Sequence, residues 1–232
     1  MSDCPEPRLW TGPNLASGTP VRCVVLVVHG GKPDSRAPSR PWHLSGLRMW
    51  QFTWAIRRAG RQHGVLAVQL QNRFRGWNGA ERSPVEDARW ALRRIHRDHP
   101  GTPVVVVGHS MGGRTAAAVA DDPQVIGIVA LAPWWPDGGE LGTVRVDQTI
   151  RVLHGRSDSW TDPMKSRREV EAAKSRGVDA RYIEMPGGHF MIRCARSWVR
   201  TATESVMDVA EHLRPRGSRP RNVCSEDNGV TA

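Results

Sequence analysis

Short segments rich in aliphatic and β-branched residues recur along the chain, and longer segments with helical spacing separate them. Most of the short segments are bounded by Gly, Pro or polar positions. They predict six strands, at 21–28, 65–70, 104–107, 125–131, 149–153 and 180–185. The first, Val-Arg-Cys-Val-Val-Leu-Val-Val, is nearly continuous, which is typical of a strand that is covered on both faces.

The intervening segments place apolar residues at intervals near 3.6, which predicts helices. Helices are expected at 45–60, from Ser83 to a stop at His99-Pro100-Gly101, at 111–120, at about 163–176 and at about 190–212. In the first helix, Leu47, Trp50 and Trp54 are expected on the buried side, with Gly60 at its end. The last helix is expected to pack Trp198, Val199, Ala202, Val206, Val209 and Leu213.

The helix that starts near Ser83 has a clear initiation pattern. Ser83-Pro84-Val85-Glu86 has the spacing of a capping box, with Pro at the first helical position. The residues after it, Val85, Ala88, Leu92 and Ile95, form one apolar stripe. This stripe predicts a surface helix with one face on the core.

Strands that alternate with helices through short loops indicate right-handed βαβ units. The expected architecture is α/β, with a mostly parallel central sheet and helices on both faces. A single domain is expected over 21–213, since 232 residues suit one core. Residues 1–20 are interpreted as an extended lead-in or a poorly paired edge strand, and residues 214–232 as a disordered basic tail.

One glycine-rich turn carries the strongest chemical pattern. Gly108-His109-Ser110-Met111-Gly112 directly follows a predicted strand and opens a predicted helix. This is the Gly-x-Ser-x-Gly nucleophile elbow, in which a strained strand-to-helix turn exposes the serine hydroxyl. In this context Ser110 is a candidate nucleophile.

Here the sequence resembles the α/β-hydrolase superfamily, over about residues 21–213. That resemblance implies a nucleophile, an acid and a histidine in this chain order. Asp158 follows the strand at 149–153 in a Gly-x-x-Asp pattern, and His189 lies in Pro-Gly-Gly-His-Phe between the last strand and the last helix. The resemblance therefore implies a Ser110, Asp158 and His189 triad, with Asp162 and Asp137 as alternative acids.

The same resemblance implies an oxyanion hole. One donor is expected to be the N–H of Met111, the residue after the nucleophile. The other is expected from the His29-Gly30-Gly31 loop, with Gly31 favoured and Lys32 next. His109 is interpreted as a packing residue, His154 as structural, and His29 as a hydrogen-bonding residue of its loop.

The surroundings of the site are expected to be open. Only about 17 residues separate the strands ending near 131 and starting at 149, so no cap domain fits there. The cleft is open unless the 32–48 or 72–82 loop covers it. Trp134, Trp135 and Trp160 are candidate substrate contacts, with ordinary packing as the alternative, and as contacts they would indicate an apolar acyl or aromatic group.

Composition adjusts this picture in two respects. The net charge of +10 indicates an acidic partner at face value. However, only three of the 33 basic residues are lysine, and the arginines are scattered over predicted helix faces. We therefore interpret the arginines as solvated residues on helix faces, and we expect neither a nucleic acid nor a membrane as a partner. The four cysteines lack metal spacing and are expected as reduced thiols, although a single bridge stays open.

Taken together, these patterns predict a cytoplasmic serine hydrolase that cleaves a small-molecule ester or thioester through an acyl-enzyme on Ser110. No phosphate-binding, dinucleotide-binding or metal motif is found, so no cofactor and no metal are expected. The compact plan resembles small carboxylesterases and dienelactone hydrolases, with Ser where the latter carry Cys. The alternatives are an amidase or perhydrolase on the same triad, or a non-catalytic binding protein of this fold.

Overall fold

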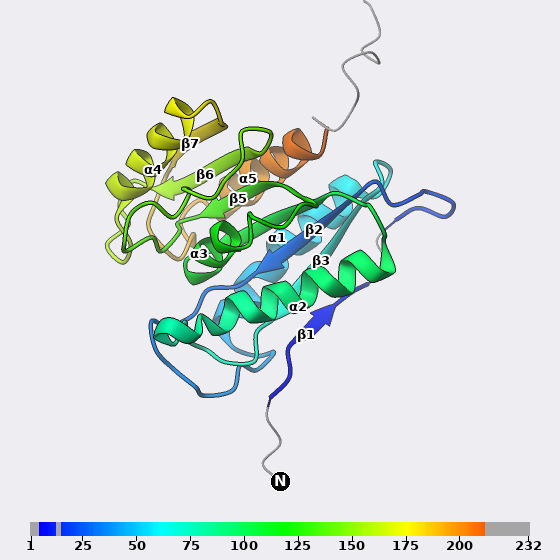
Figure 1. The fold of residues 1–232 in the computed structure, drawn as a ribbon, viewed down its shortest axis with the longest axis horizontal. Helices are drawn as coiled ribbons and strands as arrows, with labels where there is room; N and C mark the ends of the chain where they lie inside the picture. Colours follow the sequence, from blue (N-terminus) through cyan, green and yellow to red (C-terminus); the bar gives the residue numbers. More distant parts are fainter. Residues whose placement is uncertain (1–4, 13–14, 212–232) are drawn as a thin grey trace, which may run out of the picture.

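A seven-stranded sheet forms the centre of the computed structural model, which describes residues 5–12 and 15–211 (Figure 1). The strands are β1 (Arg8–Trp10), β2 (Cys23–Val28), β3 (Val65–Gln71), β4 (Val104–His109), β5 (Val125–Leu131), β6 (Thr149–Gly155) and β7 (Asp179–Met185). Their order is β1-β3-β2-β4-β5-β6-β7, and every neighbouring pair is parallel except β1 and β3. The six expected strands are therefore present, in the expected mostly parallel sheet.

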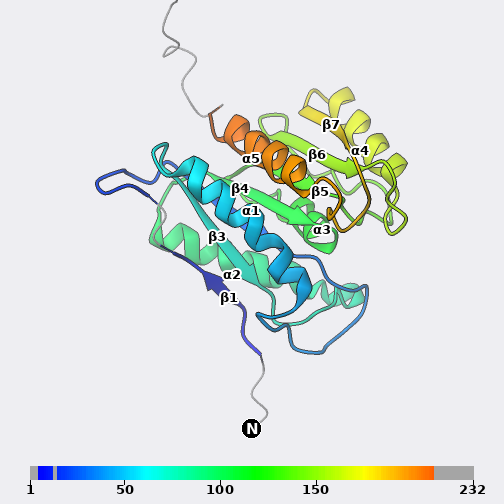
Figure 2. The ribbon, with the colours of Figure 1, turned by 180° about the vertical axis from the view of Figure 1, so that it is seen from behind.

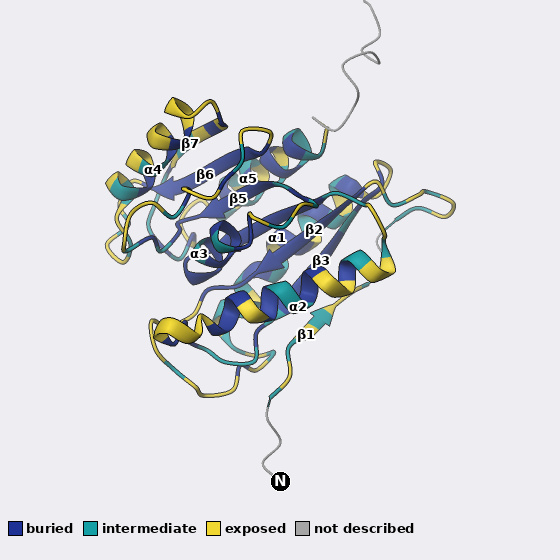
Figure 3. Cartoon of the chain, in the orientation of Figure 1, coloured by how far each residue is buried: buried dark blue, intermediate teal, exposed yellow. Residues whose placement is uncertain are grey.

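Helices cover both faces of this sheet. They are α1 (Leu44–Gly60), α2 (Ser83–Asp98), α3 (Met111–Ala118), α4 (Pro163–Ser175) and α5 (Ala195–Glu211), with a short 3-10 turn, η1 (Gly79–Glu81). Side chains of β2 alternate between two cores: Val24 and Leu26 pack on the side of α2, α3 and α4, and Val25 packs on the side of α1 and α5. Figures 1 and 2 view the sheet from these two sides, and Figure 3 shows the strands β2 to β6 mostly buried between the layers.

The buried face of α1 differs from the expected one. Leu47 and Trp54 are 46% and 63% exposed, whereas Met49, Phe52 and Ile56 are fully buried. Both sets follow helical spacing, but they are offset by two residues and thus lie about 200° apart around the helix. The tryptophans indicated the wrong stripe because bulk alone does not say which of two apolar faces meets the sheet.

The start of α2 also differs. The residue before the helix is Arg82, in a left-handed conformation with φ of 45°, and no side chain caps the helix. Ser83 is already helical, and its hydroxyl accepts a hydrogen bond from the side chain of Asn78 at 3.0 Å. The predicted capping box is therefore wrong, although the predicted apolar stripe of α2 is buried as expected.

The last helix is shorter than predicted. It begins at Ala195 rather than near 190, because the chain turns at Met191 and Cys194, which have positive φ values of 56° and 57°. Trp198, Ala202, Val206 and Val209 are buried as expected. The predicted contact of Leu213 and the predicted disorder of 214–232 lie outside the described residues.

The amino-terminal segment forms the edge strand that was one of two expectations. Arg8, Leu9 and Trp10 of β1 pair antiparallel with β3.

Cys23 is buried and Cys194 is exposed, and both are free thiols; Cys4 and Cys224 lie outside the described residues. Over the described part of the chain, no helix combines the length and apolar character needed to cross a membrane.

Because β2 to β7 run parallel, their carboxyl ends meet at one edge of the sheet. The segments that follow β2, β4, β6 and β7 carry Gly31, Ser110, Asp158 and His189. In α/β sheets ligands bind at this edge. The fold therefore brings four distant pieces of sequence to one location.

Candidate active site

Ser110 lies at a sharp turn between β4 and α3. Its backbone has φ of 54° and ψ of −117°, a conformation that non-glycine residues rarely adopt. The turn requires glycine on both sides, because a Cβ on Gly108 would lie 2.1 Å from the Gly112 carbonyl oxygen, and one on Gly112 would lie 2.4 Å from that of Val28. The predicted elbow is thus present, and it holds Ser110 at the base of a cleft.

The imidazole of His189 contacts this serine. His189 lies in the turn between β7 and α5, and its Nε2 atom is 3.0 Å from Ser110 Oγ. His109 stabilises this turn, because its Nε2–H donates to the carbonyl oxygen of His189 at 3.0 Å. Burial and the charge of His189 lower the pKa of His109 to about 3, so His109 stays neutral and acts as the packing residue that was expected.

Asp158 lies on the opposite side of the same imidazole. Its Oδ2 atom is 2.9 Å from His189 Nδ1. Its other oxygen, Oδ1, accepts the backbone N–H groups of Trp160 and Thr161 at 2.8 and 2.9 Å. These bonds fix the plane of the carboxylate, and the three side chains form one continuous hydrogen-bonded chain from Ser110 to Asp158.

A second histidine reaches the same carboxylate. Nε2 of His154 lies 3.2 Å from Asp158 Oδ2, and its Nδ1 lies 2.9 Å from the hydroxyl of Ser166. Burial alone would raise the pKa of Asp158, but the hydrogen bonds from His154, His189 and the two backbone N–H groups outweigh it and hold that pKa far below its ordinary value. His154 is fully buried, as a structural residue would be, yet sequence analysis did not anticipate its contact with Asp158.

The alternative acids have other roles. Asp162 caps α4 by accepting the N–H of Met164 at 2.8 Å. Asp137 pairs with Arg114 and is mostly exposed. Among the described residues, Asp158 is the carboxylate that contacts His189.

The loop after β2 lies against the elbow. The N–H of Lys32 donates to the carbonyl of Arg75 at 2.8 Å, so this group is not available to a ligand. In contrast, the hydrogen bonds of the described residues use neither the N–H of Gly31 nor that of Met111. Gly31 has no room for a side chain, because a Cβ there would lie 2.3 Å from the Arg75 carbonyl oxygen and 2.5 Å from Met111 Cε. His29 bonds its loop as expected, through Nδ1 to the Gly30 carbonyl at 2.7 Å.

A cleft of about 800 Å³ opens above Ser110. Trp134 and Trp160 line it, and Trp160 is 71% exposed with its ring stacked on that of His189 at 6.2 Å. Trp135 does not line it: this residue is buried in the core, and its Nε1–H donates to the Gly113 carbonyl at 3.4 Å. Trp135 was therefore wrongly included among the substrate contacts, because consecutive residues of an extended segment point to opposite sides.

The walls of the cleft come mainly from two segments. The 32–48 loop and the start of α1 contribute Pro33, Ser39, Trp42 and Leu44, and the turn after β7 contributes Phe190 and Ile192. Residues 132–148, which connect β5 to β6, contain no helix or strand. The expectation that no cap domain is inserted between β5 and β6 is thus confirmed.

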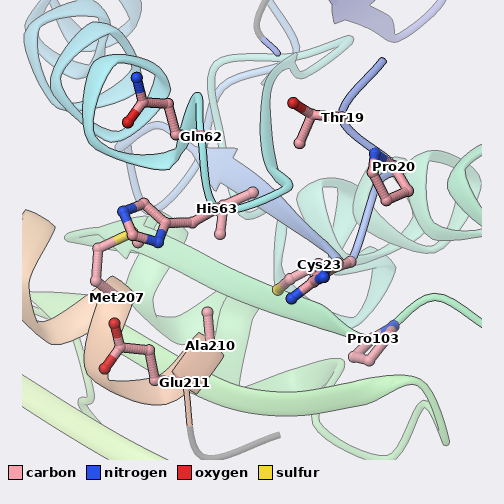
Figure 4. A pocket seen from close by; sticks show the side chains of 11 residues that line it. Thr19, Pro20, Cys23, Gln62, His63, Pro103, Met207, Ala210 and Glu211 are labelled. Carbon is pink, nitrogen blue, oxygen red and sulfur yellow. The ribbon is translucent and has the colours of Figure 1, made fainter. Parts of the chain in front are cut away.

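A second cavity, of about 500 Å³, lies at the other edge of the sheet (Figure 4). It is lined by the amino ends of β2 and β3 and by the end of α5, with Cys23, His63 and Met207 among its residues. Burial raises the pKa of the Cys23 thiol to about 12, so this cysteine is not a thiolate at neutral pH. Across the described residues, no cluster of three or more His, Cys, Asp or Glu side chains is arranged to hold a metal ion.

The comparisons with known proteins agree with this fold. A model of the alpha/beta hydrolase family matches residues 24–218. Among solved structures, a serine hydrolase without a lid from Xanthomonas campestris is 17% identical with a TM-score of 0.63, covering 88% of this chain and 94% of its own. An esterase from Pyrococcus furiosus is 13% identical with a TM-score of 0.64, covering 81% of each chain. Est1E from Butyrivibrio proteoclasticus is 14% identical with a TM-score of 0.62, covering 91% of this chain and 97% of its own. Among curated proteins, no sequence match is found.

Proposed function

Because this chain belongs to the alpha/beta hydrolase family, we propose that it is a serine hydrolase that cleaves carboxylic ester or thioester bonds through an acyl-enzyme on Ser110. The observation that carries the proposal is the hydrogen-bonded chain of three side chains, with 3.0 Å from Ser110 Oγ to His189 Nε2 and 2.9 Å from His189 Nδ1 to Asp158 Oδ2. A base within this distance of a serine hydroxyl meets the geometric requirement for general-base catalysis.

In the proposed first half-reaction, Ser110 Oγ attacks the carbonyl carbon while its proton moves to His189 Nε2. The imidazolium that forms is stabilised by the Asp158 carboxylate at its Nδ1. When the tetrahedral intermediate collapses, His189 returns the proton to the leaving alcohol or thiol. The acyl group is then bonded to Ser110.

In the second half-reaction, water takes the place of the leaving group. His189 removes a proton from the water as it attacks the acyl carbon, and returns a proton to Ser110 Oγ as the acid leaves. The enzyme is then restored, and one water is consumed per bond cleaved. Both tetrahedral intermediates carry a negative oxygen, for which we propose the N–H groups of Gly31 and Met111 as donors.

The walls of the cleft support an apolar group on the substrate. Trp134, Trp160, Leu44 and Ile192 present large apolar surfaces next to Ser110. A linear acyl chain or an aromatic ring would bury surface there without leaving polar groups unpaired. The open connection between β5 and β6 places no cap over this group.

The test is a panel of 4-nitrophenyl esters from acetate to palmitate, together with acyl-thioesters, measured on the wild type and on Ser110→Ala. We expect hydrolysis by the wild type and a loss of at least about 1000-fold in kcat in Ser110→Ala, since removing a nucleophile eliminates the covalent path. Equal rates for both proteins, or no rate for either on any substrate, would favour a non-catalytic binding protein of this fold.

A further inference from the structure

Among the described residues that line the cleft around Ser110, several carry a positive charge and none carries a negative one. Three permanently charged side chains line it, those of Lys32, Arg48 and Arg75. No Asp or Glu is among the lining residues. Asp158 lies behind His189 with its side chain fully buried, so it adds no exposed negative charge to the cleft.

Arg48 is a partly buried cation of the cleft wall. This half-buried residue of α1 lies with its guanidinium 4.8 Å from the centre of the Phe190 ring, and that ring lies 5.3 Å from the ring of His189. Burial lowers the pKa of Arg48. Within the part of the chain that the structure describes, it makes no ion pair.

The same fold shows how a buried arginine is otherwise stabilised. Arg151 on β6 is more deeply buried than Arg48, and its guanidinium contacts the carboxylates of Asp179 and Asp208 at 2.9 and 2.8 Å. Burial lowers the pKa of Arg151, but these two carboxylates outweigh it, and the net shift is upward. A buried charge without such partners costs folding free energy, and at a cleft wall a ligand anion would recover that cost.

The other two cations lie on the oxyanion side. The N–H of Lys32 donates to the Arg75 carbonyl, which holds the two residues next to each other beside Gly31. His43 lines the same cleft, and burial together with the charges of Arg75 and Arg40 lowers its pKa. The three cations that line the cleft thus come from three segments: the start of α1, the loop after β2 and the loop after β3.

We infer that the ester hydrolysed at Ser110 carries a carboxylate on its acyl or alcohol part, which Arg48 binds, with Lys32 and Arg75 adding to the attraction. This inference rests on the proposed function. An arginine fork matches a carboxylate with two parallel hydrogen bonds. The apolar walls of the same cleft contact the carbon skeleton that joins the carboxylate to the ester.

The experiment compares charged esters with neutral esters of the same shape. For the acyl side, these are 4-nitrophenyl hydrogen adipate and its primary amide, 4-nitrophenyl adipamate; for the alcohol side, 4-acetoxybenzoate and 4-acetoxybenzamide. The measured quantity is the ratio of kcat/KM for the charged member to that for the neutral member. We expect a ratio of at least about ten in one pair, since a charge-assisted hydrogen bond corresponds to about that factor.

Arg48→Gln should lower that ratio about tenfold. Arg58→Gln is the matched control, because Arg58 lies on the same helix, is exposed and contacts Trp54 outside the cleft, so it should keep the wild-type ratio. A ratio at or below one in both pairs, measurable turnover of neither pair, or an unchanged ratio in Arg48→Gln would overturn the inference. The proposed function is judged separately, by covalent labelling of Ser110 with a fluorophosphonate, which needs no charged substrate.

Discussion

His154 and His189 contact the same oxygen of Asp158, at 3.2 and 2.9 Å. The hydroxyl of Thr161 lies 2.9 Å from this oxygen as well. The Nε2 atom of His154 also lies 3.2 Å from the hydroxyl of Thr161, which donates to this same carboxylate oxygen, so the proton of His154 is placed on Nε2 and Ser166 Oγ donates to its Nδ1. Asp158 is therefore held as an anion in a fixed orientation while it orients His189.

The first prediction concerns His154. His154→Phe removes a donor to Asp158 and should lower kcat about tenfold with little change in KM, because the imidazole of His189 is less firmly oriented. His154→Gln, whose amide can still donate, should recover much of this loss. Steady-state kinetics on both variants tests this, and equal losses in Phe and Gln variants would indicate packing alone.

The same contact predicts a pH dependence of stability. The folded-state pKa of Asp158 is depressed, so its contribution to stability is present above the unfolded-state pKa, about 4, and is lost as pH falls through the folded-state value. His154→Phe should reduce that depression and lower the free energy of unfolding at pH 7 by about 1–3 kcal/mol. Urea unfolding from pH 3 to pH 7 measures it. The deficit should hold from pH 7 down to about pH 4 and shrink only as pH falls through the folded-state pKa of Asp158 in the variant, so the absence of a deficit at pH 7 would contradict the assignment.

Strain at Ser110 predicts opposite effects on activity and stability. Ser110→Gly should abolish hydrolysis yet raise the free energy of unfolding by about 1–3 kcal/mol, because glycine adopts a φ of 54° without strain. Ser110→Ala keeps the strain and should lose activity without this gain. If the two variants unfold at the same urea concentration, the backbone at Ser110 is not strained.

The position of Gly31 is predicted to tolerate no side chain. Gly31→Ala would place a Cβ against the Arg75 carbonyl and Met111 Cε, displacing the loop that carries the proposed oxyanion donor. We expect kcat to fall about 100-fold, the usual cost of losing one such donor. Gly46→Ala in α1 is the control, since its Cβ meets nothing closer than 4.0 Å, and its kcat should match the wild type.

Trp160 and Trp135 predict contrasting phenotypes. Trp160→Ala removes an exposed ring from the cleft and should raise KM for aromatic or long-chain esters about threefold to tenfold, with little change in stability. Trp135→Ala removes a core side chain and should cost about 3–5 kcal/mol of stability. Ester kinetics and thermal unfolding on both variants separate these roles, and a KM effect confined to Trp135→Ala would reverse them.

Much of this site could be predicted from sequence because each motif is local and tied to a strand end. Ser110, Asp158 and His189 each lie in a short pattern directly after a predicted strand, and parallel strands bring such ends together. The identity of the acid remained open among three aspartates, since only the fold decides which carboxylate reaches His189.

Other features depend on contacts that a linear pattern does not contain. The face of α1 was misjudged because two stripes share the same spacing, and Arg48, which lies between Leu47 and Met49, was overlooked as a result. The contact of His154 with Asp158 depends on the path of the loop after β6, although their separation of four residues was a usable hint. The turn at Met191 and Cys194 shortens α5 through positive φ values that no residue type there predicts.

The most direct test of the account is covalent labelling of the purified protein with a fluorophosphonate, followed by intact-mass measurement and peptide mapping. We predict one adduct per chain, on the peptide containing Ser110, with labelling lost in Ser110→Ala and much slower in His189→Ala. An unlabelled wild-type protein, or an adduct on a different residue, would contradict the claim that His189 activates Ser110 as a nucleophile.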